Sequence, residues 1–337
     1  MSFLSSAADG ARPLLAVRDL RVSITAGTDT RPILHGVDFE VARGEAVSLV
    51  GESGAGKSMT ARAVARLLPH RASCQGRIEL DGVDLTSLNG AALRQARLKL
   101  GVVFQDPRAQ INPVRRIGDF LTEQLRLVRK VPRREAELRA RQMLSEVGID
   151  DAARRMRQYP SDLSGGMLQR VMIASVLLGE PELILADEPT TALDVTTQSE
   201  VLAILDELRR DRGLALLFIT HDLDLAAAVC DRTIVMYAGQ IVEQQPARAL
   251  HQAPLHPYTA ALCAARPNLD SPRKRLVSVP GSPLAAWDAG IGCAFGPRCS
   301  YRLDECDAAP IPLTHDRRGD VRCIRSAELS STLEAVR

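Results

Sequence analysis

Gly51-Glu52-Ser53-Gly54-Ala55-Gly56-Lys57-Ser58 is the stretch that decides the fold of this 337-residue chain. It fits the pattern G-x-x-x-x-G-K-[S/T], whose glycines let successive backbone N–H groups turn inward around phosphate oxygens. An apolar strand at 46–50 precedes it, and a helix over about 59–68 is predicted to follow. This strand–loop–helix order favours a nucleotide site over a ligand-free glycine turn, because the helix points its positive end at the bound anion.

The loop residues have distinct predicted roles. Lys57 is expected to reach the β- and γ-phosphates of the nucleotide, and Ser58 to give an oxygen to Mg²⁺. The remaining contacts to phosphate are expected from the backbone of Gly51, Ser53, Gly54 and Gly56.

Strand and helix patterns extend outward on both sides of the loop. Short alternating runs predict β-strands within 14–50, and 76–85 is typical of a small hairpin. Residues 88–160 are rich in helix formers, with Pro107, Pro113 and Pro132 as breakers. Beyond 163 the pattern alternates helix with strand at 183–186, 214–220 and 233–237, which predicts a parallel α/β sheet.

Two acidic residues follow the apolar run Leu183-Ile184-Leu185-Ala186. Strand ends are where α/β folds place ligands, so Asp187 is expected to coordinate Mg²⁺ and Glu188 to polarise the attacking water as a general base. Alone, such a pair is often a helix N-cap. The phosphate loop favours the catalytic interpretation, because it requires a strand of this kind beside it.

The segment Leu163-Ser164-Gly165-Gly166-Met167 lies about twenty residues before that strand and predicts a second anion site at a helix start. Within one chain a second site would be redundant, but it is useful if it caps the γ-phosphate of a nucleotide held by a partner subunit. With this segment the sequence resembles the ATP-binding subunits of ABC transporters, whose signature motif it matches.

That resemblance implies further roles. Gln105 matches the glutamine that senses Mg²⁺ and the attacking water, and His221 matches the switch histidine near the γ-phosphate. Asp194, in Ala192-Leu193-Asp194, resembles the loop that crosses the dimer interface. Expected catalytic residues are therefore Glu188, His221 and Gln105; expected ligands of Mg²⁺ are Ser58, Gln105 and Asp187; and the partner's ATP would meet Ser164, Gly165, Gly166 and Asp194.

One position departs from the family pattern. Many of these subunits stack adenine on an aromatic side chain shortly after the first strand, whereas this chain offers Ile24 there. An aliphatic side chain contacts the base without aromatic stacking. The departure predicts either weak selection between ATP and GTP or an asymmetric pair of subunits.

The resemblance implies a RecA-like P-loop core with an antiparallel β-subdomain and a helical subdomain. We place the nucleotide-binding domain at 14–252, its helical subdomain at about 90–165, and a C-terminal Cys-rich domain at 253–337. The helical subdomain would dock onto the permease. The Arg-rich stretch 126–141 within it is interpreted as a solvated helix face, with contact to anionic lipid as the alternative.

The C-terminal part contains Cys293, Cys299, Cys306 and Cys323. Zinc sites usually show closer cysteine pairs, whereas widely spaced sets of four can hold an iron–sulfur cluster. With His256–Thr259 and Pro280–Pro283, this tail resembles that of oligopeptide and dipeptide importer ATPases, some of which bind a [4Fe–4S] cluster. A cluster is the favoured interpretation; zinc, with His315 as a ligand, and unliganded thiols remain alternatives.

Composition restricts the partners. A net charge of +2 and an aromatic content of 3% argue against nucleic acid as the main partner. No apolar run approaches the roughly 18 residues of a membrane span. The resemblance implies a peripheral subunit on the cytoplasmic face of the inner membrane. It would work with two permeases, a second ATPase subunit and an extracytoplasmic substrate-binding protein, using ATP and Mg²⁺ to import di- or oligopeptides.

Two other functions stay open at this point. Nickel or another small solute is the alternative cargo, because related ATPases serve metal importers. A non-transport ABC ATPase is the alternative of another class, although it would usually have two fused cassettes or a coiled-coil insertion.

Overall fold

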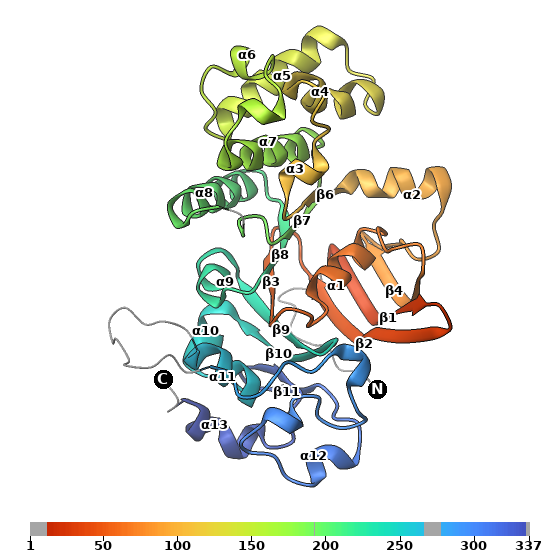
Figure 1. Ribbon diagram of the computed structural model, residues 1–337, viewed down its shortest axis with the longest axis vertical. Helices are drawn as coiled ribbons and strands as arrows, with labels where there is room; N and C mark the ends of the chain where they lie inside the picture. The colour runs from red at the N-terminus through yellow and green to blue at the C-terminus, as the bar shows by residue number, and fades with distance from the viewer. Residues whose placement is uncertain (1–11, 192, 266–277, 335–337) are drawn as a thin grey trace.

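A mixed sheet of eight strands forms the centre of the molecule (Figure 1), whose computed structural model describes residues 12–191, 193–265 and 278–334. Five parallel neighbours carry the site, and their apolar residues are buried on both faces, as a covered parallel sheet requires. The strand order is β11-β12-β10-β9-β3-β8-β7-β6. Bounds are β3 Ala46–Val50, β6 Leu100–Val103, β7 Leu183–Asp187, β8 Ala215–Thr220, β9 Arg232–Tyr237, β10 Gln240–Pro246, β11 Thr314–Asp316 and β12 Gly319–Val321.

A second, antiparallel sheet of four strands lies beside α1 (Figure 1). Its inner positions, such as Leu20 and Val22 of β1, are fully buried while the residues between them are exposed or half-buried, the alternation expected of a sheet with one covered face. The strand order is β2-β1-β4-β5, with β1 Leu15–Ala26, β2 Asp29–Val41, β4 Ala72–Leu80 and β5 Val83–Asp84.

Helices cover the central sheet and form a separate layer at the top of Figure 1. That upper layer is held by an apolar core that includes Leu121, Leu144 and Leu168. Its helices are α3 Pro107–Gln110, α4 Ile117–Leu127, α5 Arg133–Glu146, α6 Ala152–Arg155, 3₁₀ turn Pro160–Asp162 and α7 Gly165–Leu178. The others up to the tail are α1 Lys57–Val64, α2 Gly90–Ala96, 3₁₀ turn Arg97–Lys99, α8 Val195–Asp211, α9 Leu223–Val229 and α10 Ala247–Gln252.

The C-terminal part packs below the phosphate-loop end of the sheet (Figure 1). Its hairpin β11–β12 joins the central sheet, because Val321 pairs with Glu243 and Asp320 with Gln244 of β10. The tail therefore extends the core sheet, a feature that fading periodicity did not predict. Its helical segments are α11 Pro257–Ala264, 3₁₀ turns Ala286–Asp288 and Gly296–Arg298, α12 Glu305–Ala308 and α13 Ser326–Glu334.

Most predicted elements occur with shifted ends. The helix after the phosphate loop begins at Lys57 rather than 59 and ends at Val64 rather than 68, because Arg66 takes a positive φ of 56°. Strand β6 belongs to the central sheet although it falls in 90–165, since its short apolar run pairs with β7. The domain limits themselves stay a prediction.

The Arg-rich stretch forms ordinary surface pairs. On α5 Arg133 bonds Glu137 at 2.8 Å and Arg139 bonds Glu135 at 2.6 Å, both one helical turn apart. These pairs favour the solvated-face interpretation over contact with lipid, because the guanidinium groups already have carboxylate partners.

Candidate functional site

The phosphate loop occupies 51–56, between the end of β3 and the start of α1. At two of its glycines a larger side chain would strain the backbone or clash with a neighbour. Gly56 has a φ of 104°, and a Cβ on Gly51 would lie 2.2 Å from the carbonyl oxygen of Met236 on the neighbouring strand. The loop is therefore pressed against β9 and curls tightly before the helix.

Lys57 lies at the centre of this curl. Its ammonium is buried and donates to the carbonyl oxygens of Gly51, at 2.8 Å, and Glu52, at 3.0 Å. Burial lowers the pKa of Lys57, and the nearby carboxylates of Glu188, Asp187 and Glu52 act in the opposite direction. A buried cation beside a helix N-terminus is chemically suited to a polyphosphate.

Ser58 and Asp187 meet across the site. The hydroxyl of Ser58 donates to Oδ1 of Asp187 at 2.8 Å. Burial raises the pKa of Asp187, and the neighbouring Glu188 adds to this. A half-buried carboxylate beside a hydroxyl is the hard oxygen set that Mg²⁺ prefers, and a divalent cation would offset the cost of burying that charge. These residues fit the expected Mg²⁺ ligands.

The three expected catalytic residues come together at Glu188. Its carboxylate accepts from Gln105 Nε2 at 3.3 Å and from the hydroxyl of Thr191 at 3.0 Å, and its Oε1 lies 3.6 Å from Nδ1 of His221. The backbone of Glu188 has a φ of 45°, and its N–H donates to the carbonyl of Ile219 on β8. Such a strained backbone is concentrated at functional sites.

The signature segment lies elsewhere in the chain. Ser164 is the N-cap of α7, where its hydroxyl accepts from the N–H of Met167 at 3.3 Å. Figure 1 places α7 in the upper helical layer, away from α1 and the phosphate loop. Gly165 and Gly166 face the start of α8, since a Cβ on Gly166 would lie 2.4 Å from Thr197. The chain thus does not fold its signature onto its own phosphate loop.

Asp194 is the N-cap of α8: its carboxylate accepts from the N–H of Thr197 at 3.0 Å. Its neighbour Ala192, the first residue of the predicted interface loop, lies outside the described residues. Ile24 is half-buried on β1, where it pairs with Arg31 of β2 and Ala72 of β4. Neither of these two paired residues is aromatic, so neither supplies the stacking side chain that Ile24 lacks.

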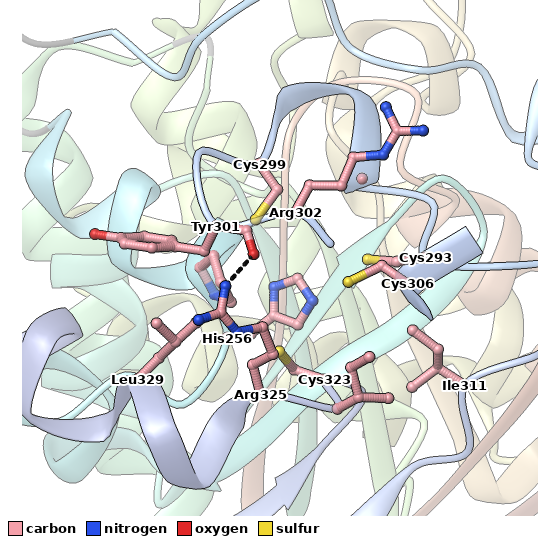
Figure 2. A pocket seen from close by; sticks show the side chains of 13 residues that line it. His256, Cys293, Cys299, Tyr301, Arg302, Cys306, Ile311, Cys323, Arg325 and Leu329 are labelled. Atoms are coloured by element: carbon pink, nitrogen blue, oxygen red, sulfur yellow. Dashed lines mark hydrogen bonds between the residues drawn. The ribbon is translucent and has the colours of Figure 1, made fainter. Parts of the chain in front are cut away.

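The four C-terminal cysteines line one pocket together with His256 (Figure 2). Burial raises the pKa of Cys293 and Cys299 and raises that of Cys323 to about 11. No disulfide joins these four thiols. His315 does not line the pocket; it bonds Asp320 at 2.7 Å on the hairpin β11–β12.

His256 is the feature of this pocket that sequence reasoning missed. It is fully buried, its Nδ1 accepts from the N–H of Tyr258 at 3.0 Å, and burial lowers its pKa to about 3. The neutral ring therefore carries its proton on Nε2, a buried donor that forms no well-aligned hydrogen bond with the described residues, although the backbone of Arg322 lies close to the ring. Figure 2 shows this ring pointing into the space between the cysteines.

The arrangement of the cysteines does not support the predicted iron–sulfur cluster. Among the residues that the structure describes, no group of three or more His, Cys, Asp or Glu side chains is arranged to hold a metal ion. The thiols share a pocket without converging on one point, and the raised pKa values of Cys293, Cys299 and Cys323 favour the protonated form over the thiolate that binds metal. A bound cluster is thus not supported by this arrangement.

Comparisons with known proteins agree with the phosphate loop and signature. The sequence pattern of the ABC transporter family matches residues 34–191, and that of the oligopeptide/dipeptide transporter, C-terminal region, matches residues 242–306. The chain is 40% identical to the oligopeptide transport ATP-binding protein OppD of Haemophilus influenzae, over 94% of this chain and 98% of that protein. It belongs to the oligopeptide/dipeptide family of ABC transporter ATP-binding subunits.

Other members and structures support the same assignment. OppD of Escherichia coli K12 is 39% identical over 94% of each chain. Among solved structures, the dimeric post-hydrolysis state of the ATP-binding cassette MJ0796, bound to ADP and Pi, is similar with a TM-score of 0.62 and 28% identity. It covers 69% of this chain and 99% of that one, so the α/β cassette fold is shared. None of the helices within the described ranges combines the length and apolarity needed to span a bilayer.

Proposed function

We propose that this chain hydrolyses ATP as one of two paired cassettes that drive an ABC importer of di- or oligopeptides. The observation that carries the catalytic part is the convergence of Gln105 and His221 on the Glu188 carboxylate, beside the bonded pair Ser58–Asp187. The cargo class is supported by the oligopeptide names of its relatives and by the C-terminal family match.

In this proposal each group has a separate role. The triphosphate lies on the loop N–H groups, and Lys57 exchanges its carbonyl partners for β- and γ-phosphate oxygens. Ser58 and Asp187 hold Mg²⁺. Glu188 takes the proton of the attacking water, while Gln105 and His221 orient that water and the γ-phosphate.

The second cassette completes the site. Ser164, Gly165 and Gly166 at the start of α7 cap the partner's γ-phosphate, and Asp194 lies at the interface. The dimeric state of MJ0796 supports this pairing. Closing the pair moves the permeases, which contact the upper helical layer; exposed apolar side chains there support a docking role, namely Val114, Leu127, Val128 and Leu138.

In the assembled importer the chain sits on the cytoplasmic face of the membrane, beneath two permeases and opposite a substrate-binding protein on the other side. The partner cassette is either a copy of this chain or a homologue. A strain lacking this chain tests the cargo: loss of di- and oligopeptide uptake with normal nickel uptake supports the proposal, and the reverse result would favour the metal-importer alternative.

Glu188→Gln tests the catalytic assignment. The variant keeps the size and hydrogen-bonding capacity of residue 188 but cannot accept a proton, so turnover should fall by about 10²-fold or more while an ATP-bound dimer accumulates in gel filtration. Glu182→Gln, a change at the opposite end of the same strand, is the matched control. Undiminished turnover in Glu188→Gln would refute Glu188 as the base.

A further inference from the structure

Glu52, the second residue of the phosphate loop, is contacted at three points. Its N–H donates to the hydroxyl of Tyr258 at 2.9 Å, and its carbonyl accepts from Lys57 at 3.0 Å. Its carboxylate accepts from both ends of the Arg298 guanidinium, at 2.6 Å from Nη1 to Oε2 and 3.1 Å from Nη2 to Oε1. Two of these three contacts come from the C-terminal part of the chain.

Arg298 is held in place independently of Glu52. Its side chain is 5% exposed, and it also donates to the hydroxyl of Tyr237 at 3.3 Å and to the carbonyl of Gly281 at 3.4 Å. The guanidinium lies 5.7 Å from the ring centres of both Tyr237 and Phe295. A two-pronged pair of this kind fixes the orientation of the carboxylate as well as its charge.

The charge of Glu52 matters because its loop receives a polyanion. A carboxylate in a partly buried loop repels bound phosphate more strongly than it would in water. It also attracts the ammonium of Lys57, since Glu52 is one of the carboxylates acting on that group. Without Arg298, the carboxylate of Glu52 would therefore oppose ATP directly and compete with ATP for Lys57.

We propose that Arg298 is a positioning residue of the ATP site: by pairing with Glu52 it cancels that charge and keeps the carboxylate away from Lys57. The ammonium and the loop N–H groups then remain available to the triphosphate. Tyr258 assists by fixing the backbone of Glu52. The C-terminal part thereby contributes to ATP affinity in each subunit, without contacting the nucleotide. This inference rests on the proposed ATP-binding function.

The experiment measures ATP affinity and steady-state turnover with purified full-length protein. Arg298→Ala should raise the Kd for ATP by about tenfold, equivalent to ~1.4 kcal/mol, with kcat at saturating ATP changed by less than about threefold. Glu52→Gln alone should change the Kd by less than about threefold, because it removes the charge that Arg298 cancels. The double variant Glu52→Gln/Arg298→Ala should recover to within about threefold of the wild type.

Arg232→Ala is the matched control. Arg232 also forms a two-pronged pair with a glutamate, Glu45, but at the other end of β3 from the phosphate loop. Removing it should lower thermal stability while leaving the Kd for ATP unchanged. If Arg298→Ala does not fold, Arg298→Lys and Glu52→Gln still test the idea: the lysine variant keeps the charge but loses the two-pronged geometry, so its Kd for ATP should rise, by less than the tenfold expected for alanine, and adding Glu52→Gln should reverse that rise.

The outcomes separate this inference from the proposed function. A wild-type chain that does not bind ATP would refute the proposed function itself. ATP binding by the wild type with an unchanged Kd in Arg298→Ala would overturn only the role of Arg298. A double variant as weak as Arg298→Ala would also overturn it, because the effect would then be purely structural.

Discussion

Tyr258→Phe isolates one hydrogen bond beneath the phosphate loop. Tyr258 is fully buried, with ring centres 4.7 Å from Tyr237 and 5.3 Å from Phe295. Phenylalanine keeps the ring and leaves no cavity, so the loss is confined to the hydroxyl that accepts the N–H of Glu52. An unsatisfied buried donor costs about 1–3 kcal/mol. Because Glu52 is only partly buried, we expect a loss in the lower half of that range, ~1–2 kcal/mol.

Equilibrium denaturation in urea, without nucleotide, measures this loss, and the melting temperature should fall by a few degrees. Tyr159→Phe is the control, because Tyr159 is 40% exposed and its hydroxyl has access to water. The reasoning would be refuted if the two variants differed in free energy of unfolding by less than about 0.3 kcal/mol, the scatter expected for independent surface changes.

Three further changes test other parts of the structure. His256 has a pKa of about 3 in the fold and an ordinary value of 6.5, so the unfolded chain binds an extra proton between these two pH values. The free energy of unfolding should therefore fall as pH decreases through that window, by at most ~1.4 kcal/mol per pH unit. His256→Asn keeps an acceptor for the N–H of Tyr258 without titrating, so its stability should depend less steeply on pH; equal slopes would contradict the assignment. Gly239→Ala should cost about 1–3 kcal/mol in thermal unfolding, since its Cβ would lie 2.2 Å from a carbonyl oxygen of β2, and more than Gly213→Ala, which has a similar φ but open space. Ser58→Ala should reduce Mg²⁺-dependent turnover by about 10²-fold, and full activity at ordinary Mg²⁺ concentrations would exclude Ser58 as a ligand.

Local patterns were sufficient to predict that the phosphate-loop residues and Asp187 lie close together. Asp187 ends one apolar strand, and Lys57 and Ser58 follow another through the phosphate loop. Strands this apolar are expected in the middle of a sheet, and parallel pairing brings their carboxyl ends to the same edge. Gln105, Glu188 and His221 come from three strand ends, and the resemblance supplied their roles. The strained φ of Glu188 had no signal in the sequence, because glutamate has no preference for that conformation.

Contacts between distant segments were beyond the sequence. Arg298 and Glu52 are 246 positions apart, and nothing local to either residue predicts the other. His256 was noticed only as part of a His-Pro-Tyr-Thr segment, because its place among the cysteines depends on how the tail folds back. The cysteine spacing likewise predicted that the four thiols share one location, but it could not show that they do not converge on one point.

The hairpin β11–β12 has a consequence for the outer edge of the central sheet. Strand β10 pairs with β9 on one side and with β12 on the other, so its outer edge is covered by residues that lie more than seventy positions later in the sequence. A chain shortened to its cassette would expose that edge, including the buried side chains of Glu243, Gln244 and Gln245. An open strand edge is a template for pairing with other molecules, so the shortened protein would aggregate through strand exchange.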